Sequence, residues 1–158
     1  MNVLLRAPLL TNSGYGVHSR QIFEWLHGKK NINLYVQCLN WGRTSWIINP
    51  DFQDGLFGKI MNHSKEIKGK FDLSIQVQLP DEWDPKLANK NIGVSAVVET
   101  DRCNPDWASR CNTMDAVVVP SNFSKNVLKN SGFIKTDILV IPEWYNTHIN
   151  NRKAINKI

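Results

Sequence analysis

The sequence has no long apolar run. Nowhere do about 18 apolar residues follow one another, so no membrane-spanning segment is expected. Cysteine is scarce: Cys38, Cys103 and Cys111 are odd in number, widely spaced and form no CxxC pair. This pattern argues against a disulfide framework and favours a reducing, cytoplasmic setting. The 4 histidines show no metal-ligand spacing, either among themselves or with the cysteines, so no metal is expected.

The sequence also lacks the hydrolase motifs GxSxG and HExxH, and it has no long basic run. The net charge of +5 comes from dispersed lysines without an RNA-binding signature, so nucleic-acid binding is not expected. The simplest interpretation of the positive net charge is that it keeps the protein soluble. Attraction to anionic ligands, or peripheral contact with a lipid surface, is the alternative. With 42% hydrophobic and 21% charged residues, the 158-residue chain suits one soluble domain with a real core.

Strand-like and helix-like segments alternate along the chain. Short, β-branched apolar runs without polar alternation are typical of parallel strands covered on both faces. The alternating stretch 71–79 is the exception, and we expect that strand to be less buried than the others. The pattern predicts an α/β fold: a Rossmann-like, doubly wound, mainly parallel sheet of six to seven strands with helices on both faces. The expected strands are 2–6, 33–39, 71–79, 91–98, 115–119 and 137–141, and the expected helices are 17–27, 56–63, 105–112 and 122–130.

Ligands of such sheets gather at the carboxyl ends of the strands. One candidate there is the glycine segment (Ser13, Gly14, Tyr15 and Gly16), expected as a loop before the first helix. Glycines let a ligand approach the backbone, and a helix N-terminus offers free amides to a phosphate. A tight turn without a ligand explains the segment equally well. The dinucleotide fingerprint GxGxxG is incomplete, because Ser19 stands at the third glycine position.

A second candidate is the acidic–arginine cluster (Glu99, Thr100, Asp101 and Arg102), expected directly after the strand 91–98. Carboxylates accept hydrogen bonds from sugar hydroxyls, and an arginine holds a phosphate in a forked geometry. The alternative is a salt-bridged loop. Trp107 is either a packing residue or a platform for a sugar, and Ser121 is either a helix cap alone or also a ligand contact.

Three blocks of the sequence, in order and across nearly the whole chain, point to one family. They are the glycine segment, the acidic–arginine cluster with Pro105 and Trp107, and residues 115–123 followed by Ser131-Gly132. Together they resemble the N-terminal lobe of GT-B glycosyltransferases of the family 4 type. Residues 141–146 are similar to the stretch that closes this lobe. Two departures concern the end of the fourth strand, which has no histidine, and Trp144-Tyr145-Asn146, which replaces the usual Gly-Val-Asp.

Enzymes of that family have two Rossmann-like lobes with the active site between them. The resemblance implies that residues 1–146 form the acceptor-side lobe and that 147–158 are a tail or the start of an interlobe connection. The glycine segment would then face the donor phosphates. The acceptor side would be lined by Glu99, Thr100, Asp101, Arg102, Trp107 and Ser121. Because of the two departures, no catalytic residue is assigned.

The resemblance therefore implies a lobe of an enzyme that transfers a sugar from a nucleotide-sugar donor to a sugar or sugar-lipid acceptor. It would need a donor-binding lobe, in the same or another chain, but no cofactor or metal. An exposed half-cleft could be covered by a homodimer. Two alternatives stay open: a stand-alone, non-catalytic binding or assembly module, and another nucleotide-binding Rossmann protein. Against the latter, Cys38-Leu39-Asn40 lacks the acidic ribose partner expected there.

Overall fold

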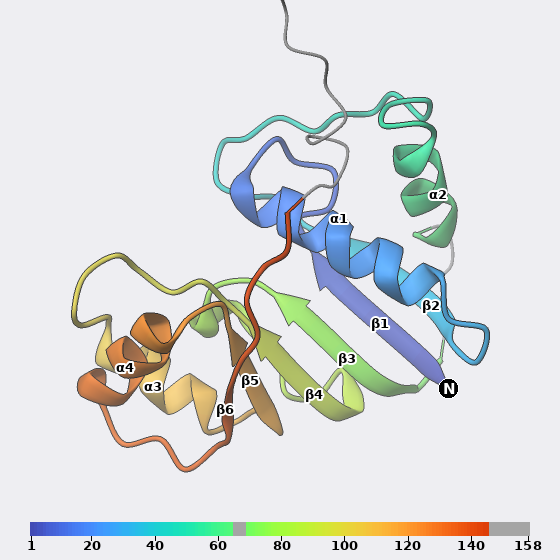
Figure 1. Cartoon of the computed structure of the whole chain (residues 1–158). Coiled ribbons are helices and arrows are strands. Elements are labelled where there is room, and N and C mark those ends of the chain that lie inside the picture. The colour runs from blue at the N-terminus through green and yellow to red at the C-terminus, as the bar shows by residue number, and fades with distance from the viewer. Residues whose placement is uncertain (65–68, 146–158) are drawn as a thin grey trace, which may run out of the picture.

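The computed structural model describes residues 1–64 and 69–145, and the predicted tail 147–158 lies outside that part. Its strands form one sheet in the order β2-β1-β3-β4-β5-β6, and every neighbouring pair is parallel (Figure 1). The prediction of a doubly wound, Rossmann-like α/β fold is confirmed. The strands are β1 (Asn2–Ala7), β2 (Asn33–Cys38), β3 (Phe71–Val77), β4 (Ala88–Val94), β5 (Ala116–Val119) and β6 (Ile138–Val140).

Helices cover both faces of this sheet, as predicted, and each face has its own apolar core. One core joins α1 and α2 to β1 and β3 through residues such as Phe23, Phe57 and Leu5. The other core lies on the opposite face of the sheet. It joins α3 and α4 to β5 and includes Trp83. The helices are α1 (Gly14–His27), α2 (Leu56–His63), α3 (Pro105–Cys111) and α4 (Asn122–Ser131), with a short 3-10 helix η1 (Pro80–Glu82) after β3.

The first helix starts three residues earlier than the sequence pattern predicts. The Ser13 hydroxyl accepts a hydrogen bond from the Gly16 N–H at 2.9 Å, so Ser13 is the N-cap and Gly14 begins the helix. The predicted loop is therefore a cap followed by the first helical turn. The predicted caps of α3 and α4 are confirmed, because Asn104 accepts from Asp106 and Ser121 accepts from Ser124.

The prediction of a strand running from 91 to 98 straight into Glu99 is wrong, because β4 ends at Val94. Beyond β4, the backbone of Ala96 forms its hydrogen bonds with side chains and not with a neighbouring strand. Its N–H donates to the Tyr15 hydroxyl at 3.0 Å, and its carbonyl accepts from the Ser124 hydroxyl at 3.0 Å. The next residue, Val97, has φ 70°, in the left-handed region that a β-branched residue rarely adopts. The chain thus turns away from the sheet before it reaches the acidic–arginine cluster.

The expectation that the alternating strand is less buried is also wrong, because β3 lies in the middle of the sheet between β1 and β4. Its polar residues Ser74 and Gln76 are fully buried. Ser74 donates to the Asn91 side chain at 2.7 Å, and Gln76 donates to the Asp84 carbonyl at 2.7 Å. Buried polar groups are stable where they are hydrogen-bonded, so the alternation marks a buried polar face.

The loop after β1 is fixed on the first turns of α1. The buried guanidinium of Arg20 donates to the carbonyls of Leu9 at 2.9 Å and Thr11 at 3.0 Å, and burial lowers the pKa of Arg20. Gly16 packs directly on Thr11: a Cβ at Gly16 would overlap the Thr11 carbonyl oxygen. These contacts fix the position of the N-terminus of α1 at the carboxyl end of the sheet.

Candidate ligand-binding site

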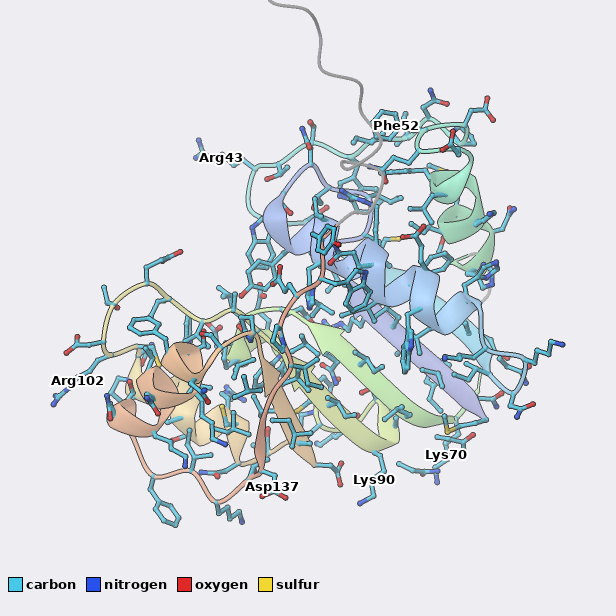
Figure 2. All side chains as sticks on the ribbon, in the orientation of Figure 1. Arg43, Phe52, Lys70, Lys90, Arg102 and Asp137 are labelled. Carbon is cyan, nitrogen blue, oxygen red and sulfur yellow. The ribbon has the colours of Figure 1, made fainter. Side chains whose placement is uncertain are left out.

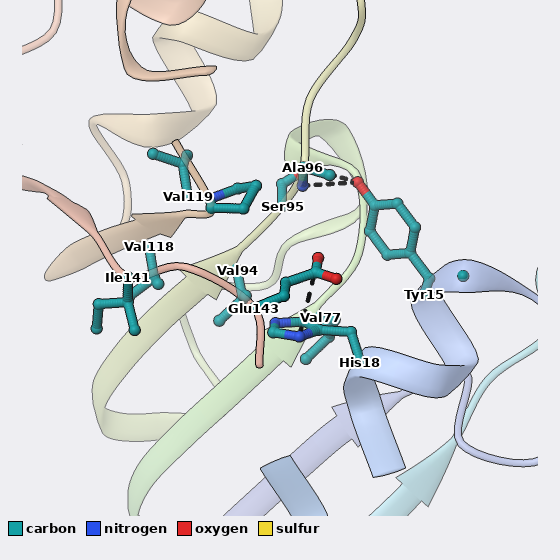
Figure 3. Close-up of a pocket in the computed structure, with 12 residues that line it drawn as sticks. Tyr15, His18, Val77, Val94, Ser95, Ala96, Val118, Val119, Ile141 and Glu143 are labelled. Carbon is teal, nitrogen blue, oxygen red and sulfur yellow. Dashed lines mark hydrogen bonds and ion pairs between the residues drawn. The ribbon is translucent and has the colours of Figure 1, made fainter. Parts of the chain in front are cut away.

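A cavity of about 220 Å³, here called the pocket, opens at the carboxyl ends of β3, β4 and β5 beside the first turn of α1 (Figure 3). The strand order reverses between β1 and β3, and ligands of doubly wound sheets bind outside the carboxyl ends near such a reversal. The pocket lies next to that point. Its lining comprises Gly14, Tyr15, His18, Val77, Val94, Ser95, Ala96, Val118, Val119, Pro120, Ile141 and Glu143.

The pocket has an apolar floor. Val77, Val94 and Val118 are register partners on three adjacent strands, so their side chains form a row on one face of the sheet. This is the face covered further along by α1, because Val77 and Val94 belong to the same core as Phe23. The row offers a ligand an apolar surface rather than hydrogen-bonding groups.

Tyr15 forms one wall of the pocket. Its hydroxyl lies 3.0 Å from the Ser95 hydroxyl and accepts the Ala96 N–H, and its ring stacks on Trp41 with 3.9 Å between centroids. Burial raises the pKa of Tyr15, so the phenol is neutral. The hydroxyl connects α1 to the end of β4. Its role is to fix the turn that follows β4.

His18 and Glu143 lie next to each other in the lining of the pocket (Figure 3). His18 lies on α1 one turn after Gly14, and its Nδ1 is 3.8 Å from Glu143 Oε1. The His18 side chain is 12% exposed, and its Nδ1 is buried without a hydrogen-bond partner. The Glu143 side chain is 44% exposed. An imidazole and a carboxylate facing one cavity can bind and transfer a proton.

Glu143 belongs to residues 141–145, here called the strap, which run from β6 across the sheet face towards α1 (Figure 1). The Ile141 N–H donates to the Val119 carbonyl at 2.9 Å, and the Gln21 amide donates to the Trp144 carbonyl at 2.6 Å. The strap is thus attached to the sheet at one end and to α1 at the other, with Glu143 between the two attachments.

The residues of the glycine segment have two different roles. Gly14 and Tyr15 line the pocket, whereas Ser13 caps α1 and Gly16 packs on Thr11. A Cβ at Gly14 would meet no atom within 4 Å, so this glycine leaves open space at the pocket mouth.

The acidic–arginine cluster lies outside the pocket. Its four residues are exposed in the loop between β4 and α3, where the Thr100 hydroxyl donates to the Arg102 carbonyl at 2.7 Å. Figure 2 shows Arg102 pointing to solvent at the end of the molecule formed by α3 and α4, away from α1. Trp107 packs against the core of α3 and α4, and Ser121 caps α4 beside the pocket residue Pro120. The structure does not bring this predicted set together with Gly14.

Sequence reasoning missed His18 and Glu143. His18 had a local signal, because it follows Gly14 by four positions and so shares its helix face. Glu143 lies in residues 141–146, which were singled out for their similarity to the stretch that closes the lobe, but no local pattern showed that the strap would bring Glu143 to the pocket.

The fold and the pocket define a Rossmann-like α/β protein with a ligand-sized cavity at the carboxyl ends of its strands. Comparisons of the chain with protein-family models, with curated proteins and with solved structures found no match. Within residues 1–64 and 69–145, no cluster of three or more His, Cys, Asp or Glu side chains could hold a metal ion. In the same part of the chain, no helix is long and apolar enough to cross a membrane.

Proposed function

We propose that the chain is the acceptor-side lobe of a glycosyltransferase that transfers a sugar from a nucleotide-sugar donor to a hydroxylated acceptor. A second lobe, in the same or another chain, would bind the donor. The single observation that carries the proposal is the pocket, which combines an apolar floor with His18, Glu143 and the N-terminus of α1. The sequence blocks that resemble family 4 enzymes support the same assignment.

The chemistry of the lining suits a sugar ring. The valine floor offers a surface for the apolar face of the ring, and the Glu143 carboxylate accepts hydrogen bonds from its hydroxyls. The cavity of about 220 Å³ is smaller than the roughly 300–1,000 Å³ of pockets for drug-sized ligands. It has room for one ring, and a longer ligand would extend beyond its open side. The incomplete dinucleotide fingerprint, with Ser19 at the third glycine position, favours a sugar-binding lobe over the alternative of an NAD-type protein.

The charges around the pocket favour a donor-phosphate site to which both lobes contribute. The first turn of α1 has no acidic residue, and the amides of Gly14 and Tyr15 lie at the positive end of the helix dipole, where a donor phosphate would be stabilised. The residues lining the pocket include no lysine or arginine, so the cations that neutralise a diphosphate would come from the second lobe. We assign the protein to the cytoplasm, because Cys38, Cys103 and Cys111 are free thiols and such cysteines persist in reducing compartments.

Saturation-transfer NMR on the 158-residue chain tests the proposal, with methyl glycosides of common hexoses as probes and NAD as the competing ligand. Gly14→Leu adds a side chain at the pocket mouth, where its Cβ would meet no atom within 4 Å. Asn12→Leu, at an exposed position outside the pocket, is the matched control.

We expect at least one glycoside to receive saturation from the wild type and from Asn12→Leu, and to lose it with Gly14→Leu. Arg102→Ala measures whether the acidic–arginine cluster takes part in the same binding. Binding of NAD without any glycoside, or a glycoside signal that Gly14→Leu leaves unchanged, would refute the proposed site.

A further inference from the structure

A second and larger cavity, of about 770 Å³, lies between α1 and α2 and is here called the groove. The two helices pack side by side, with the Arg20 guanidinium 5.1 Å from the centre of the Phe57 ring (Figure 1). The volume of the groove falls within the roughly 300–1,000 Å³ that is typical of ligand sites, whereas the pocket is smaller. The groove therefore has room for a larger ligand than the pocket can hold.

The groove and the pocket are neighbours, because the strap and α1 line both. On the strap, Glu143 lines the pocket, whereas Trp144 and Tyr145 line the groove. On α1, His18 lines the pocket and the preceding residue, Val17, lines the groove. A ligand of several linked units with its end in the pocket therefore has the groove beside it.

The lining of the groove combines aromatic rings with planar polar side chains. Tyr145 is 64% exposed and Trp144 is 45% exposed, so the core does not use up either ring. Gln21, Gln53 and Glu24 add amide and carboxylate groups. An amide both donates and accepts hydrogen bonds, a carboxylate accepts them, and an aromatic ring offers a rigid apolar face. This combination suits sugar rings, which have an apolar face and a rim of hydroxyls.

Two residues on the α2 side of the groove have an unusual backbone conformation. Gln53 has φ 52° and Asp54 has φ 54°, in the left-handed region that residues other than glycine rarely adopt. Strained positions of this kind occur preferentially at ligand sites. Both residues line the groove, so the strained turn places two polar side chains on its wall.

The charges of the groove favour a neutral ligand. Arg20 and Lys59 contribute positive charge to the lining, and Glu24 and Asp54 contribute negative charge. Burial lowers the pKa of His27, so this lining residue is neutral at neutral pH. A ligand with several charges of one sign would meet a like charge in either case, so an uncharged ligand fits the groove best.

From these observations we infer that the acceptor is an uncharged oligosaccharide, with its terminal sugar in the pocket and its further sugars in the groove. The inference rests on the proposed function, because it takes the pocket to be a sugar site. Trp144 and Tyr145 stack on the rings of the bound chain, and Gln53 and Glu24 bind its hydroxyls. The groove thereby selects a sugar chain over a single sugar.

Isothermal titration calorimetry on the 158-residue chain tests the inference. The probes are neutral tetrasaccharides of glucose, mannose and galactose, each compared with the methyl glycoside of its own sugar. We expect at least one tetrasaccharide to bind about tenfold more tightly than its methyl glycoside, because the groove adds ring stacking and hydrogen bonds.

Two variants remove groove side chains without disturbing the fold. Tyr145→Ala removes an exposed ring, and Gln53→Gly removes the amide while suiting the positive φ of that position. Each should weaken tetrasaccharide binding by about three- to tenfold and leave the affinity for the methyl glycoside unchanged. Phe133→Ala, which removes an 83% exposed ring outside both cavities, is the matched control and should change neither affinity. Tetrasaccharide binding that ignores both groove variants would overturn the inference.

The outcomes separate this inference from the proposed function. If a methyl glycoside binds and Gly14→Leu abolishes the binding, but no tetrasaccharide binds more tightly, the inference fails and the proposed function stands. If a tetrasaccharide binds and is weakened by Tyr145→Ala but not by Gly14→Leu, the groove binds sugar chains and the proposed pocket site fails. If no saccharide binds, both fail. A dimer in sedimentation equilibrium that Tyr145→Ala dissociates would assign the groove to a second copy of the chain and overturn the inference.

Discussion

Gly16→Ala is the substitution that best tests how the protein places its pocket. In an exposed helix this change would add about 1 kcal/mol of stability through helix propensity. Here the new Cβ would overlap the Thr11 carbonyl oxygen and lie 2.8 Å from the Thr11 hydroxyl oxygen. Thr11 is fully buried and cannot retreat freely, because its carbonyl accepts from Arg20 and its hydroxyl donates to the Pro8 carbonyl at 2.8 Å.

The magnitude follows from these contacts. Overpacking costs about 1–3 kcal/mol, and losing the hydrogen bond from Arg20 to the displaced carbonyl costs about 1.5–3 kcal/mol. The gain in helix propensity offsets about 1 kcal/mol of this. We therefore expect Gly16→Ala to lower the free energy of unfolding by roughly 1.5–5 kcal/mol.

Urea unfolding followed by tryptophan fluorescence measures the difference. Gly14→Ala is the matched control, because it changes the same residue type in the same helical turn, where a Cβ meets no atom within 4 Å. Its free energy of unfolding should stay at the wild-type value or rise by up to about 1 kcal/mol through helix propensity. If the two variants are equally stable, the loop after β1 does not pack on α1 as described and the account of how the pocket is positioned is wrong.

Two further predictions concern single side chains. Tyr15→Phe removes the acceptor of the Ala96 N–H and should lower the free energy of unfolding by about 1–3 kcal/mol in the same urea assay; no loss would mean that the hydroxyl does not fix the turn after β4. The second concerns pH. The hydrogen bond from Lys90 lowers the pKa of Asp115 in the folded protein below its unfolded value, so the stabilisation is present above the unfolded pKa and is lost as pH falls through the folded one. Asp115→Asn should make the free energy of unfolding depend less steeply on pH below neutrality. The effect should be small, because the Lys90–Asp115 pair is on the surface. If the dependence at acid pH is unchanged, the pair does not stabilise the fold.

Local sequence signals predicted most of the elements. The run Ala116–Val119 is apolar and ends in three β-branched valines, and it forms β5 with the predicted end. The caps Asn104 and Ser121 start α3 and α4 where a side-chain acceptor was expected. These features depend on residues a few positions apart, which is why a single chain is enough to predict them.

The errors arose where distant parts of the chain supply the hydrogen-bond partners. The apolar residues after Val94 look like a continuing strand, but the backbone N–H and carbonyl of Ala96 are hydrogen-bonded to the side chains of Tyr15 and Ser124. The alternation of β3 looks like a half-exposed strand, but Asn91 and Asp84 satisfy its polar face inside the protein. Neither partner can be read from the segment itself.

The sequence by itself determined the order of strands and helices, the parallel doubly wound class and the presence of a glycine at the N-terminus of α1. Only the tertiary structure decided which residues share the pocket. It moved the acidic–arginine cluster away with the turn at Val97, and it brought Glu143 to His18 by way of the strap. The physical reason is that periodicity and capping act over a few residues, whereas a site depends on where separate connections leave the sheet and what they pack against.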